Sequence, residues 1–329
     1  MPSQSAASVI QIGLEATPGT QAASPLSVPV KNPHVLPKLT WVEDTGLRGS
    51  PVDLYDQIAG VYHDQYDLEG AFYADTFPLI AMAALGGTDT KTGAGPYLHT
   101  VGLKDDGTGS QPWPLSILDW DGYNGYAMTG ARIDSLRMTL AAEQDCMWQA
   151  SVISGNTPLS NTSAPSPSYS TEALPPGWSF AVTVGGSSIA YVERMEINIE
   201  RKTKPIFTGG AQSPYTVFAG TIGVSGTIEC VVASNADPFT AGSTPYATTR
   251  QGSPLVMLVQ ITDPATNHYC KFQMSNVQFT DPDRNRGKEY ISYTAAWKAT
   301  ANTTDSTASK WSPIKFAASN AVSTQYVGS

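Results

Sequence analysis

Hydrophobic and polar residues alternate along several stretches of the chain, and this alternation predicts β-strands. The clearest case is AGVYHDQYDLEGAFYAD at 59–75, because successive side chains of a strand point to opposite faces of the sheet. One predicted face is apolar and carries Tyr62, Tyr66, Leu68 and Phe72. The opposite face carries Gln65, Asp67, Glu69 and Ala71.

The second half of the chain contains two further alternating stretches. RMEINIERK (194–202) predicts a strand whose inward residues are Met195, Ile197 and Ile199. AGTIGVSGTIECVV (219–232) predicts another, whose inward residues are Ile222, Val224 and Ile228. The outward residues of this strand are Thr221, Ser225, Thr227 and Glu229. Both patterns are typical of half-buried strands that have one solvated face.

The stretch DTFPLIAMAALGG, at 75–87, predicts a short α-helix. Asp75 or Thr76 can cap its first turn, because their side-chain oxygens accept hydrogen bonds from backbone N–H groups. Pro78 suits the first turn, and Gly86 suits the exit of the helix. A long Gly-rich loop is then expected from Gly86 to about Gln111, before the next predicted strand, PLSILDW (114–120).

The order of these elements recurs in the second half. Each series runs from an alternating strand through a helix-like or short segment to an apolar strand, and then to a hairpin with tryptophan in its last strand. The hairpins end in CMWQASV (146–152) and AAWKATA (295–301), and NADPFTAG (235–242) stands where the helix stands in the first series. A polar turn is expected at 280–289, before the second tryptophan strand. We infer from this order that the chain contains a duplication.

Two kinds of weakly patterned segment delimit the repeats. Residues 156–177 are rich in Ser, Thr and Pro, which is typical of a linker, and we place the boundary near residue 165. The N-terminal residues are small and punctuated by Pro, which predicts an extended arm rather than a packed element. The expected organisation is an N-terminal arm (1–37), a first β domain (38–165), a second β domain (166–300) and a C-terminal arm (301–329).

Composition favours a folded β protein that does not grip nucleic acid. Of the 329 residues 41% are hydrophobic and only 14% are charged, with 29 Gly and 24 Pro, which favours short strands and turns over long solvated helices. The formal net charge of −9 argues against binding through phosphates, because that requires clustered Lys and Arg. The three cysteines, Cys146, Cys230 and Cys270, are too scattered for a disulfide framework and predict buried thiols in a reducing compartment.

The N-terminus has no basic region followed by a long apolar core, so no secretory signal is expected. No apolar run reaches the roughly 18 residues that span a bilayer. We therefore expect a soluble protein that is made in the cytoplasm and has no membrane partner.

The sequence contains no recognisable catalytic, cofactor or metal site. The four histidines, His34, His63, His99 and His268, show no metal-ligand spacing. Carboxylates gather within 53–69 and 193–200, but they fall on the polar faces of predicted strands, as on a solvated sheet rather than in a glycosidase pair. GVSGT (223–227) lacks the Gly-x-Ser-x-Gly spacing of a nucleophile elbow. We expect a non-enzymatic protein without cofactors.

Four stretches together resemble the major tail tube proteins of tailed bacteriophages. They are IGLEATPGTQAA near the N-terminus, DLEGAFYAD running into FPLIAMAALGG, VSGTIECVVASNADPF, and the late strand ending in AAWKA. The resemblance covers most of the chain in layout, although each motif is short. It implies two tandem β-sandwich or barrel domains, each with at most one short helix, in a virion protein of the tail that is assembled in the host cytoplasm.

The resemblance implies a structural role in a stack of rings. In this family the inner strands of the subunits join into a barrel around a lumen through which the genome passes. The long loops expected to reach the neighbouring ring are 46–57 and 203–217, and the two terminal arms would add contacts between rings. The implied partners are further copies of the chain, the tape measure protein, and the tail terminator and baseplate proteins, while DNA would pass without specific binding.

The duplication bears on the symmetry of the ring. A subunit with two copies of the fold builds a six-fold-like ring from three chains, whereas a true hexamer is the alternative. Small polar and acidic residues around the bore would repel phosphates weakly and let DNA slide. The candidate lumen-facing residues are Gln65, Asp67, Glu69, Thr221, Ser225 and Glu229; the alternative is that they face outer solvent or pack between rings.

Two other classes of protein remain open on the sequence alone, one structural and one a binding module. The first is another tail or decoration protein with a related fold, such as a terminator or baseplate component. The second is a β-sandwich adhesin or carbohydrate-binding module, which requires an exposed aromatic platform. Trp113, Trp120, Tyr123 and Tyr126 are the candidates for such a platform, although residues of this kind more often anchor a core or an interface.

Overall fold

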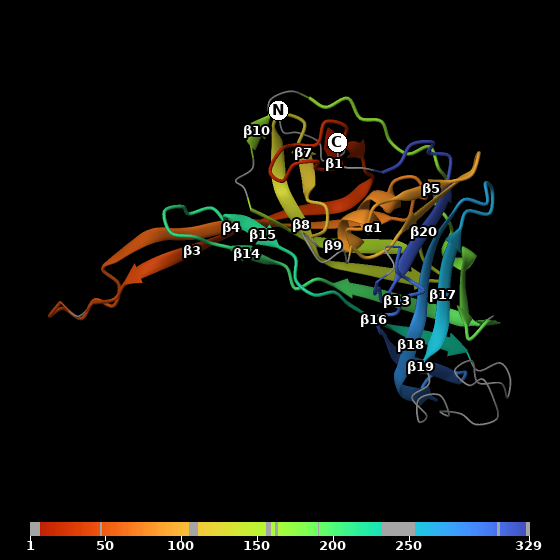
Figure 1. Cartoon of the computed structure of the whole chain (residues 1–329). Coiled ribbons are helices and arrows are strands. Elements are labelled where there is room, and N and C mark those ends of the chain that lie inside the picture. Colours follow the sequence, from red (N-terminus) through yellow and green to blue (C-terminus); the bar gives the residue numbers. More distant parts are fainter. Residues whose placement is uncertain are drawn as a thin grey trace.

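The computed structural model describes residues 7–46, 48–104, 111–155, 159–161, 164–189, 191–231, 254–307 and 310–326. Over these residues the fold is mainly β, with an α-helix of nine residues and an antiparallel network of strands that joins both halves of the chain. The expected fold class is confirmed to this extent. Figure 1 shows a compact body with one long hairpin that projects from it.

The elements of the first half lie between residues 9 and 161. They are β1 (Val9–Leu14), β2 (Leu26–Ser27), β3 (Val30–Asp44), β4 (Asp56–Ala71), α1 (Phe77–Leu85), β5 (Thr90–Thr92), β6 (Tyr97–Val101), β7 (Leu115–Trp120), β8 (Gly125–Ala141), β9 (Met147–Ser154) and β10 (Leu159–Asn161). The strands predicted at 59–75 and 114–120 and the tryptophan hairpin are confirmed in β4, β7 and the pair β8–β9.

The second half begins with a short 3-10 helix, η2 (Gly177–Ser179). Its strands are β11 (Phe180–Val184), β12 (Ser187–Ile189), β13 (Val192–Glu200), β14 (Lys204–Ile206), β15 (Thr216–Phe218), β16 (Gly223–Val231), β17 (Leu255–Thr262), β18 (Tyr269–Asn285), β19 (Ser292–Ala299) and β20 (Lys315–Asn320). The alternating strands predicted at 194–202 and 219–232 are confirmed in β13 and β16. The segment 235–242 lies outside the described residues.

One continuous run of strands crosses the body, and we call it the main sheet. Its order is β3–β4–β9–β8–β13–β16–β19–β18, and every neighbouring pair is antiparallel. The pair β8–β13 joins the two halves, with Met138 opposite Ile197 and Arg137 opposite Asn198. We call this pair the internal seam.

Each half adds flanking strands through its longest strand. The first part of β8 pairs with β7, and β7 pairs with β1. In the same way the first part of β18 pairs with β17, and β17 pairs with β11. On its other edge β18 also carries β20, followed by β6 and β5. The strand orders β3–β4–β9–β8–β7–β1 and β13–β16–β19–β18–β17–β11 therefore correspond one to one.

A glycine and a tryptophan face each other at corresponding places in the two halves. Trp148 of β9 lies opposite Gly70 of β4, and Trp297 of β19 lies opposite Gly226 of β16. Both indoles are about 1% exposed. A Cβ atom on Gly70 would lie 2.6 Å from Cζ2 of Trp148, and a Cβ atom on Gly226 would lie 2.5 Å from Cζ2 of Trp297. Each glycine therefore leaves the space that its indole fills, and at Gly226 a Cβ atom would also lie 1.9 Å from the carbonyl oxygen of Glu196.

The helix α1 lies at the centre of the core, and all nine of its residues are buried. Its proline stands in the first turn, where the missing N–H costs no helical hydrogen bond. Gly86 ends the helix in the left-handed region, with φ of 81°, and its N–H donates to the carbonyl of Met82. The predicted helix is thus confirmed, although the Thr76 side chain makes no capping hydrogen bond.

Aromatic rings from both halves meet beside this helix. The ring centroid of Phe77 lies 4.4 Å from that of Phe72, 5.9 Å from that of Phe272 and 5.5 Å from that of Phe316. Such tilted and edge-to-face contacts are favourable geometries for aromatic pairs. One hydrophobic core therefore crosses the boundary predicted near residue 165, and the boundary itself stays a prediction.

Arg201 ties the second half to the helix of the first half. Its Nε donates to the carbonyl of Ala84 and its Nη2 donates to the carbonyl of Leu85, both at 2.7 Å. These carbonyls belong to the last turn of α1, where backbone acceptors lack helical partners and attract positive charge. Burial lowers the pKa of Arg201 to about 10, so the guanidinium stays charged at neutral pH.

The structure corrects the expectation that the terminal segments are unpacked. Val9–Leu14 forms a buried strand against β7, and Lys315–Asn320 forms a strand between β18 and β6. The cause is long-range pairing, which the local composition around these strands does not reveal.

Three of the expected loops and turns also contain strands. The segment 86–111 includes β5 and β6, and the segment 203–217 includes β14 and most of β15. The turn predicted at 280–289 begins later, because β18 continues to Asn285 through an irregularity after Thr280. Strands as short as β5 and β14 have too few residues to show a two-residue alternation.

We predict that Gly70→Ala and Gly226→Ala each destabilise the folded chain by about 1–3 kcal/mol, because a methyl group overpacks the site beneath an indole. Gly223→Ala is the matched control, since nothing lies within 4 Å of a Cβ atom at that position. Chemical denaturation of the three variants measures the effect. Equal stability of Gly226→Ala and Gly223→Ala would contradict the packing described here.

Candidate functional site

The main sheet has one apolar face against the core and one polar face. The polar face draws residues from strands of both halves in aligned rows. One such row consists of Glu69, Gln149, Arg137, Asn198, Ser225, Lys298 and Gln278. The neighbouring positions on these strands, such as Leu68, Leu136 and Ile197, are buried in the core.

The structure brings most of the sequence-predicted candidates together on this face. Gln65, Asp67 and Glu69 lie on it from β4, and Ser225 and Glu229 lie on it from β16. The Gln65 amide donates to Asp67 at 3.1 Å and to Ser151 at 3.0 Å. Thr221 is different, because it is exposed and precedes the start of β16.

Sequence reasoning missed the basic residues of the polar face. Arg137 and Arg194 both donate to the carboxylate of Glu196, at 2.9 and 2.7 Å. Lys288, in the turn before β19, contacts Glu229 at 2.7 Å and Glu193 at 3.1 Å. Each of these three cations is therefore matched by a carboxylate, whereas the exposed Lys298 of the same face forms no ion pair among the described residues. The alternation in RIDSLRMTL, which contains Arg137, is the sequence signal that could have identified this strand face.

Two carboxylates on the polar face of the first half, Asp67 and Glu69, differ from Glu196 and Glu229 in their surroundings. Asp67 and Glu69 line a polar depression of about 370 Å³ together with Asn32, Gln149 and the paired Arg137. Among the described residues neither carboxylate has a Lys or Arg nitrogen within 4 Å. Asp67 and Glu69 therefore add negative charge that no ion pair neutralises, while Lys31 lies opposite Glu69 on β3 and pairs with Asp145.

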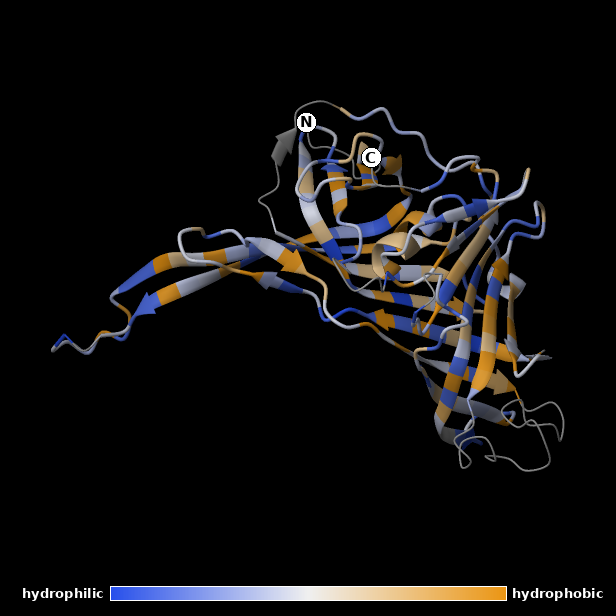
Figure 2. Cartoon of the chain, in the orientation of Figure 1, coloured by the Kyte–Doolittle hydropathy of each residue, from blue (hydrophilic) through white to orange (hydrophobic). Residues whose placement is uncertain are grey.

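The hairpin of β3 and β4 projects from the body, and we call its residues 36–63, which precede the pairing of β4 with β9, the arm (Figure 1). Figure 2 shows that hydrophobic residues recur along it, away from the core. Six of its large apolar side chains are exposed: Leu39, Trp41, Val42, Val52, Leu54 and Ile58. Exposed apolar groups gathered on one projecting element are typical of a contact surface between proteins.

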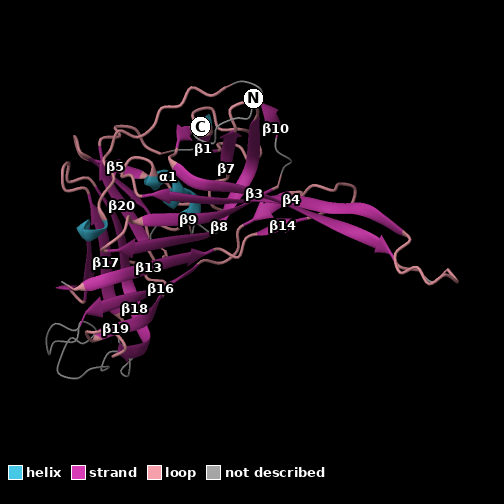
Figure 3. Ribbon diagram, turned by 180° about the vertical axis from the view of Figure 1, so that it is seen from behind, coloured by secondary structure: helices cyan, strands magenta, loops and turns pink. Residues whose placement is uncertain are grey.

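The two long loops expected from the sequence meet on the arm. The segment 46–57 forms its tip and the beginning of β4, and the segment 203–217 packs along its base. Gln212 accepts a hydrogen bond from the Tyr62 N–H at 3.1 Å and donates from its side chain to the carbonyl of Ala59 at 2.9 Å. Figure 3, seen from behind, shows β14 beside the arm. The loop of the second half therefore packs against β4 at the base of the arm, whereas the loop of the first half forms the tip.

A hollow of about 710 Å³ lies where the arm leaves the body, and its lining is mostly apolar, with Val35, Leu39, Tyr62 and Met128 among the lining residues. At its edge burial lowers the pKa of His63 and raises the pKa of Asp64.

A buried carboxylate anchors the N-terminal segment. Glu15 is fully buried and its carboxylate accepts hydrogen bonds from the Ser116 hydroxyl at 2.8 Å, the Gly130 N–H at 2.8 Å and the Gly19 N–H at 2.7 Å. Burial raises the pKa of Glu15, and these donors oppose the rise. The Glu of the Gly-x-Glu motif at 13–15 therefore holds the N-terminal segment in place through these hydrogen bonds, and we call this arrangement the staple. In the sequence, a single charged residue directly after an apolar run is the signal that could have indicated it.

His99 and the three cysteines are buried within the fold. His99 is buried, with Nδ1 at 2.7 Å from Asp89 and Nε2 at 3.0 Å from the carbonyl of Val322, which fastens the C-terminal segment. The three cysteines are buried free thiols. Within the described part of the chain no group of three or more His, Cys, Asp or Glu residues is placed to hold a metal ion, and no helix is long and apolar enough to cross a membrane.

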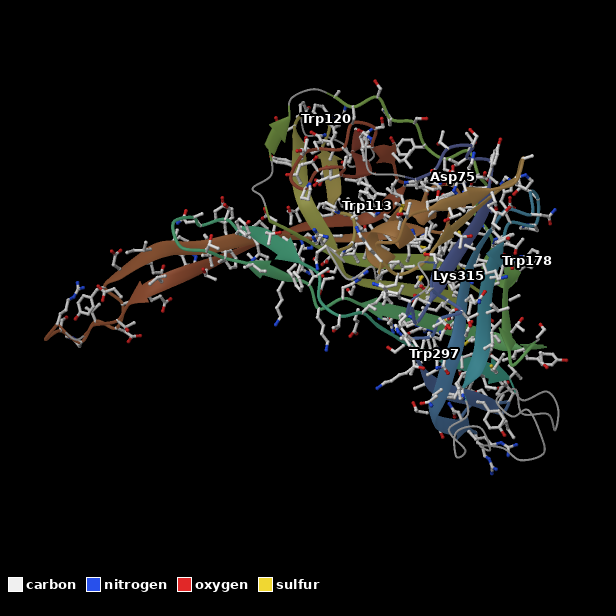
Figure 4. All side chains as sticks on the ribbon, in the orientation of Figure 1. Asp75, Trp113, Trp120, Trp178, Trp297 and Lys315 are labelled. Atoms are coloured by element: carbon white, nitrogen blue, oxygen red, sulfur yellow. The ribbon has the colours of Figure 1, made fainter. Side chains whose placement is uncertain are left out.

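The proposed aromatic platform is not formed. Trp120 is only 8% exposed, and Trp113 is partly buried with the Lys104 ammonium 5.6 Å above its ring. Figure 4 shows the two tryptophans at separate places in the body. Only Tyr123 and Tyr126 are exposed, so the four residues do not present a shared binding surface.

The chain matches one family model, and it is similar to part of a solved structure. The family model described as phage tail tube protein matches residues 5–299. No curated protein gives a significant match. Among solved structures the chain is similar to a chain in the six-fold symmetrised cryo-electron microscopy structure of the anti-feeding prophage baseplate, with 12% identity and a TM-score of 0.31. That match covers 47% of this chain and 96% of the other.

We predict that Glu15→Ala destabilises the folded chain by at least about 2 kcal/mol, because it leaves buried N–H and O–H donors without an acceptor. Glu143→Ala removes an exposed carboxylate from the turn after β8 and is the control. Denaturant midpoints at neutral pH measure both. A Glu15→Ala variant as stable as the control would show that the staple contributes nothing.

Proposed function

Because the chain belongs to the phage tail tube protein family, it is a structural component of the virion tail and not an enzyme, and we propose that it polymerises into stacked rings that form the tube for genome delivery. The observation that carries the proposal is the family match over nearly the whole chain. A main sheet with one polar face supports it, because such a sheet can line a water-filled bore while its other face packs a core.

We further infer that each ring contains three chains and has pseudo-six-fold symmetry. The support is the one-to-one correspondence of strand order in the two halves, together with the two matched glycine–tryptophan pairs. Each chain then contributes two tail-tube-like domains to the ring. The alternative is a true hexamer, in which each chain contributes one unit and the internal correspondence has no role in symmetry.

The polar face of the main sheet is the surface that we assign to the lumen. DNA must slide through the tube, and surface cations would hold it through release of its counterions. On this face Arg137 and Arg194 are matched by Glu196, and Asp67 and Glu69 add negative charge. Weak repulsion of the phosphates by such a surface would keep the passage open.

The arm is the surface that we assign to contacts between rings. It projects beyond the body and carries exposed apolar groups such as Trp41 and Ile58, which a second ring could bury. As a tube subunit the chain would also contact the tape measure protein within the lumen and the terminator and baseplate proteins at the ends of the tube. These further partners follow from membership of the family.

Electron microscopy of the purified chain, over a range of concentration and salt, tests the proposal. We expect hollow tubes or stacked rings, because joining strand edges between subunits removes the exposed edges. A chain that stays monomeric, and that is absent from the tube when tails of the intact virion are labelled with an antibody, would contradict the proposed function.

We predict that the double change Asp67→Lys and Glu69→Lys leaves tubes intact but slows DNA ejection from virions that carry it. The new ammonium groups would bind phosphates, and each such contact strengthens the binding of DNA as salt is lowered. Glu143→Lys with Glu289→Lys, in two exposed turns, makes the same change of net charge as a control. Ejection that is equally fast in both variants and independent of salt would contradict the lumen assignment.

A further inference from the structure

Among the residues that the structure describes, one edge of β3 pairs with no other strand. The strand pairs with β4 on its other edge through most of its length, and most of its 15 residues are exposed. A long edge of this kind exposes backbone groups that can pair with another chain. Pro33 and Pro37 carry no N–H, so they limit the part of β3 that can extend a ladder to its beginning, around Val30 and Lys31.

The internal correspondence identifies the counterpart of β3 in the second half. Val30 lies opposite Gly70, and Ile197 lies opposite Gly226. Since Gly70 and Gly226 occupy matching places beneath indoles, Val30 corresponds to Ile197, and β3 corresponds to β13. The second edge of β13 is covered by β8 in the internal seam.

The same reasoning identifies the counterpart of β8. Met138 of β8 lies opposite Trp148, and Phe279 of β18 lies opposite Trp297. Met138 therefore corresponds to Phe279, and β8 corresponds to β18. A seam of the same kind as β8–β13 would join β18 to β3, and within one chain the structure does not pair these two strands.

We propose that β3 of one copy pairs antiparallel with β18 of a second copy, in the register of the internal seam, with Val30 opposite Phe279 and Lys31 opposite Gln278. This inference rests on the proposed ring and specifies its interface at the level of residues. The contact is head-to-tail, because it joins the first half of one copy to the second half of the next. Repeated contacts of this kind close into a ring when the rotation between copies allows it.

The side chains on both strands fit this register. In the internal seam Ile197 and Met138 are buried in the core, whereas Asn198 and Arg137 lie on the polar face. In the proposed seam Val30, which packs against the core, and buried Phe279 take the inward places. The outward places go to Lys31 and Gln278, which are both exposed.

A register shifted by one residue does not fit. A slip by one residue would place Lys31 opposite Phe279 and bring side chains of opposite faces together, because the period of a strand is two residues. A slip by two residues preserves the faces, and it places Lys31 opposite Thr280 on the same polar side. The experiment therefore has to distinguish the proposed register from this second one.

Disulfide cross-linking of assembled tubes tests the register. Directly opposed residues of antiparallel strands have Cα atoms about 4.5–5.5 Å apart, which is within the range of a disulfide, whereas diagonal neighbours lie about 7–8 Å apart. The test variant carries Lys31→Cys and Gln278→Cys, and the matched control carries Lys31→Cys and Thr280→Cys. The native cysteines are buried, and single variants account for any reaction that involves them.

We expect mild oxidation to link chains of the test variant and not of the control, with covalent trimers as the end product on a non-reducing gel. Tubes that link only in the control pair, or in neither pair, would overturn the proposed register while leaving the ring itself in place. Tubes whose test variant links into covalent hexamers would support the register and refute the count of three chains. A wild-type chain that forms no rings in virion or solution would refute the proposed function and this interface with it.

Discussion

The pairing of strand edges is the constraint on which the rest of this structure depends. A strand without a neighbour exposes backbone N–H and C=O groups, which a folded protein must pair, cover or hydrate. The internal seam meets this constraint by placing β13 against β8, so that one sheet runs through both halves. It also defines the polar face, because Arg137 and Asn198 share a row only when the two strands are in this register. We infer that the same constraint drives assembly.

Packing fixes the main sheet to the rest of the body. The indoles of Trp148 and Trp297 fill spaces that exist only because Gly70 and Gly226 lack side chains. The guanidinium of Arg201 fixes the second half to the last turn of α1, and the carboxylate of Glu15 fixes the N-terminal strand. Each of these contacts joins residues far apart in the sequence. The arm has few such contacts and carries exposed apolar side chains instead, as expected of an element that binds another molecule.

The sequence predicts the parts of the fold that have a local cause. Alternation identifies β4, β13 and β16 because one face of each is buried, and the Pro and Gly at its ends identify α1. Local patterns do not predict that Val9–Leu14 packs in the core or that Lys315–Asn320 enters a sheet, because long-range pairing decides both. For the polar face, alternation indicates Asp67 and Glu69, whereas the ion pairs of Glu196 depend on the register between β8 and β13 and require the structure.

We infer that one chain supplies two units of a pseudo-six-fold ring. Cryo-electron microscopy of the tail tube, at a resolution that separates strands, measures the number of chains per ring most directly. The account predicts three chains, with the internal seam alternating around the ring with a seam between β3 and β18. Six chains per ring, or a bore lined by the side chains around Trp148 instead of the polar face, would contradict it.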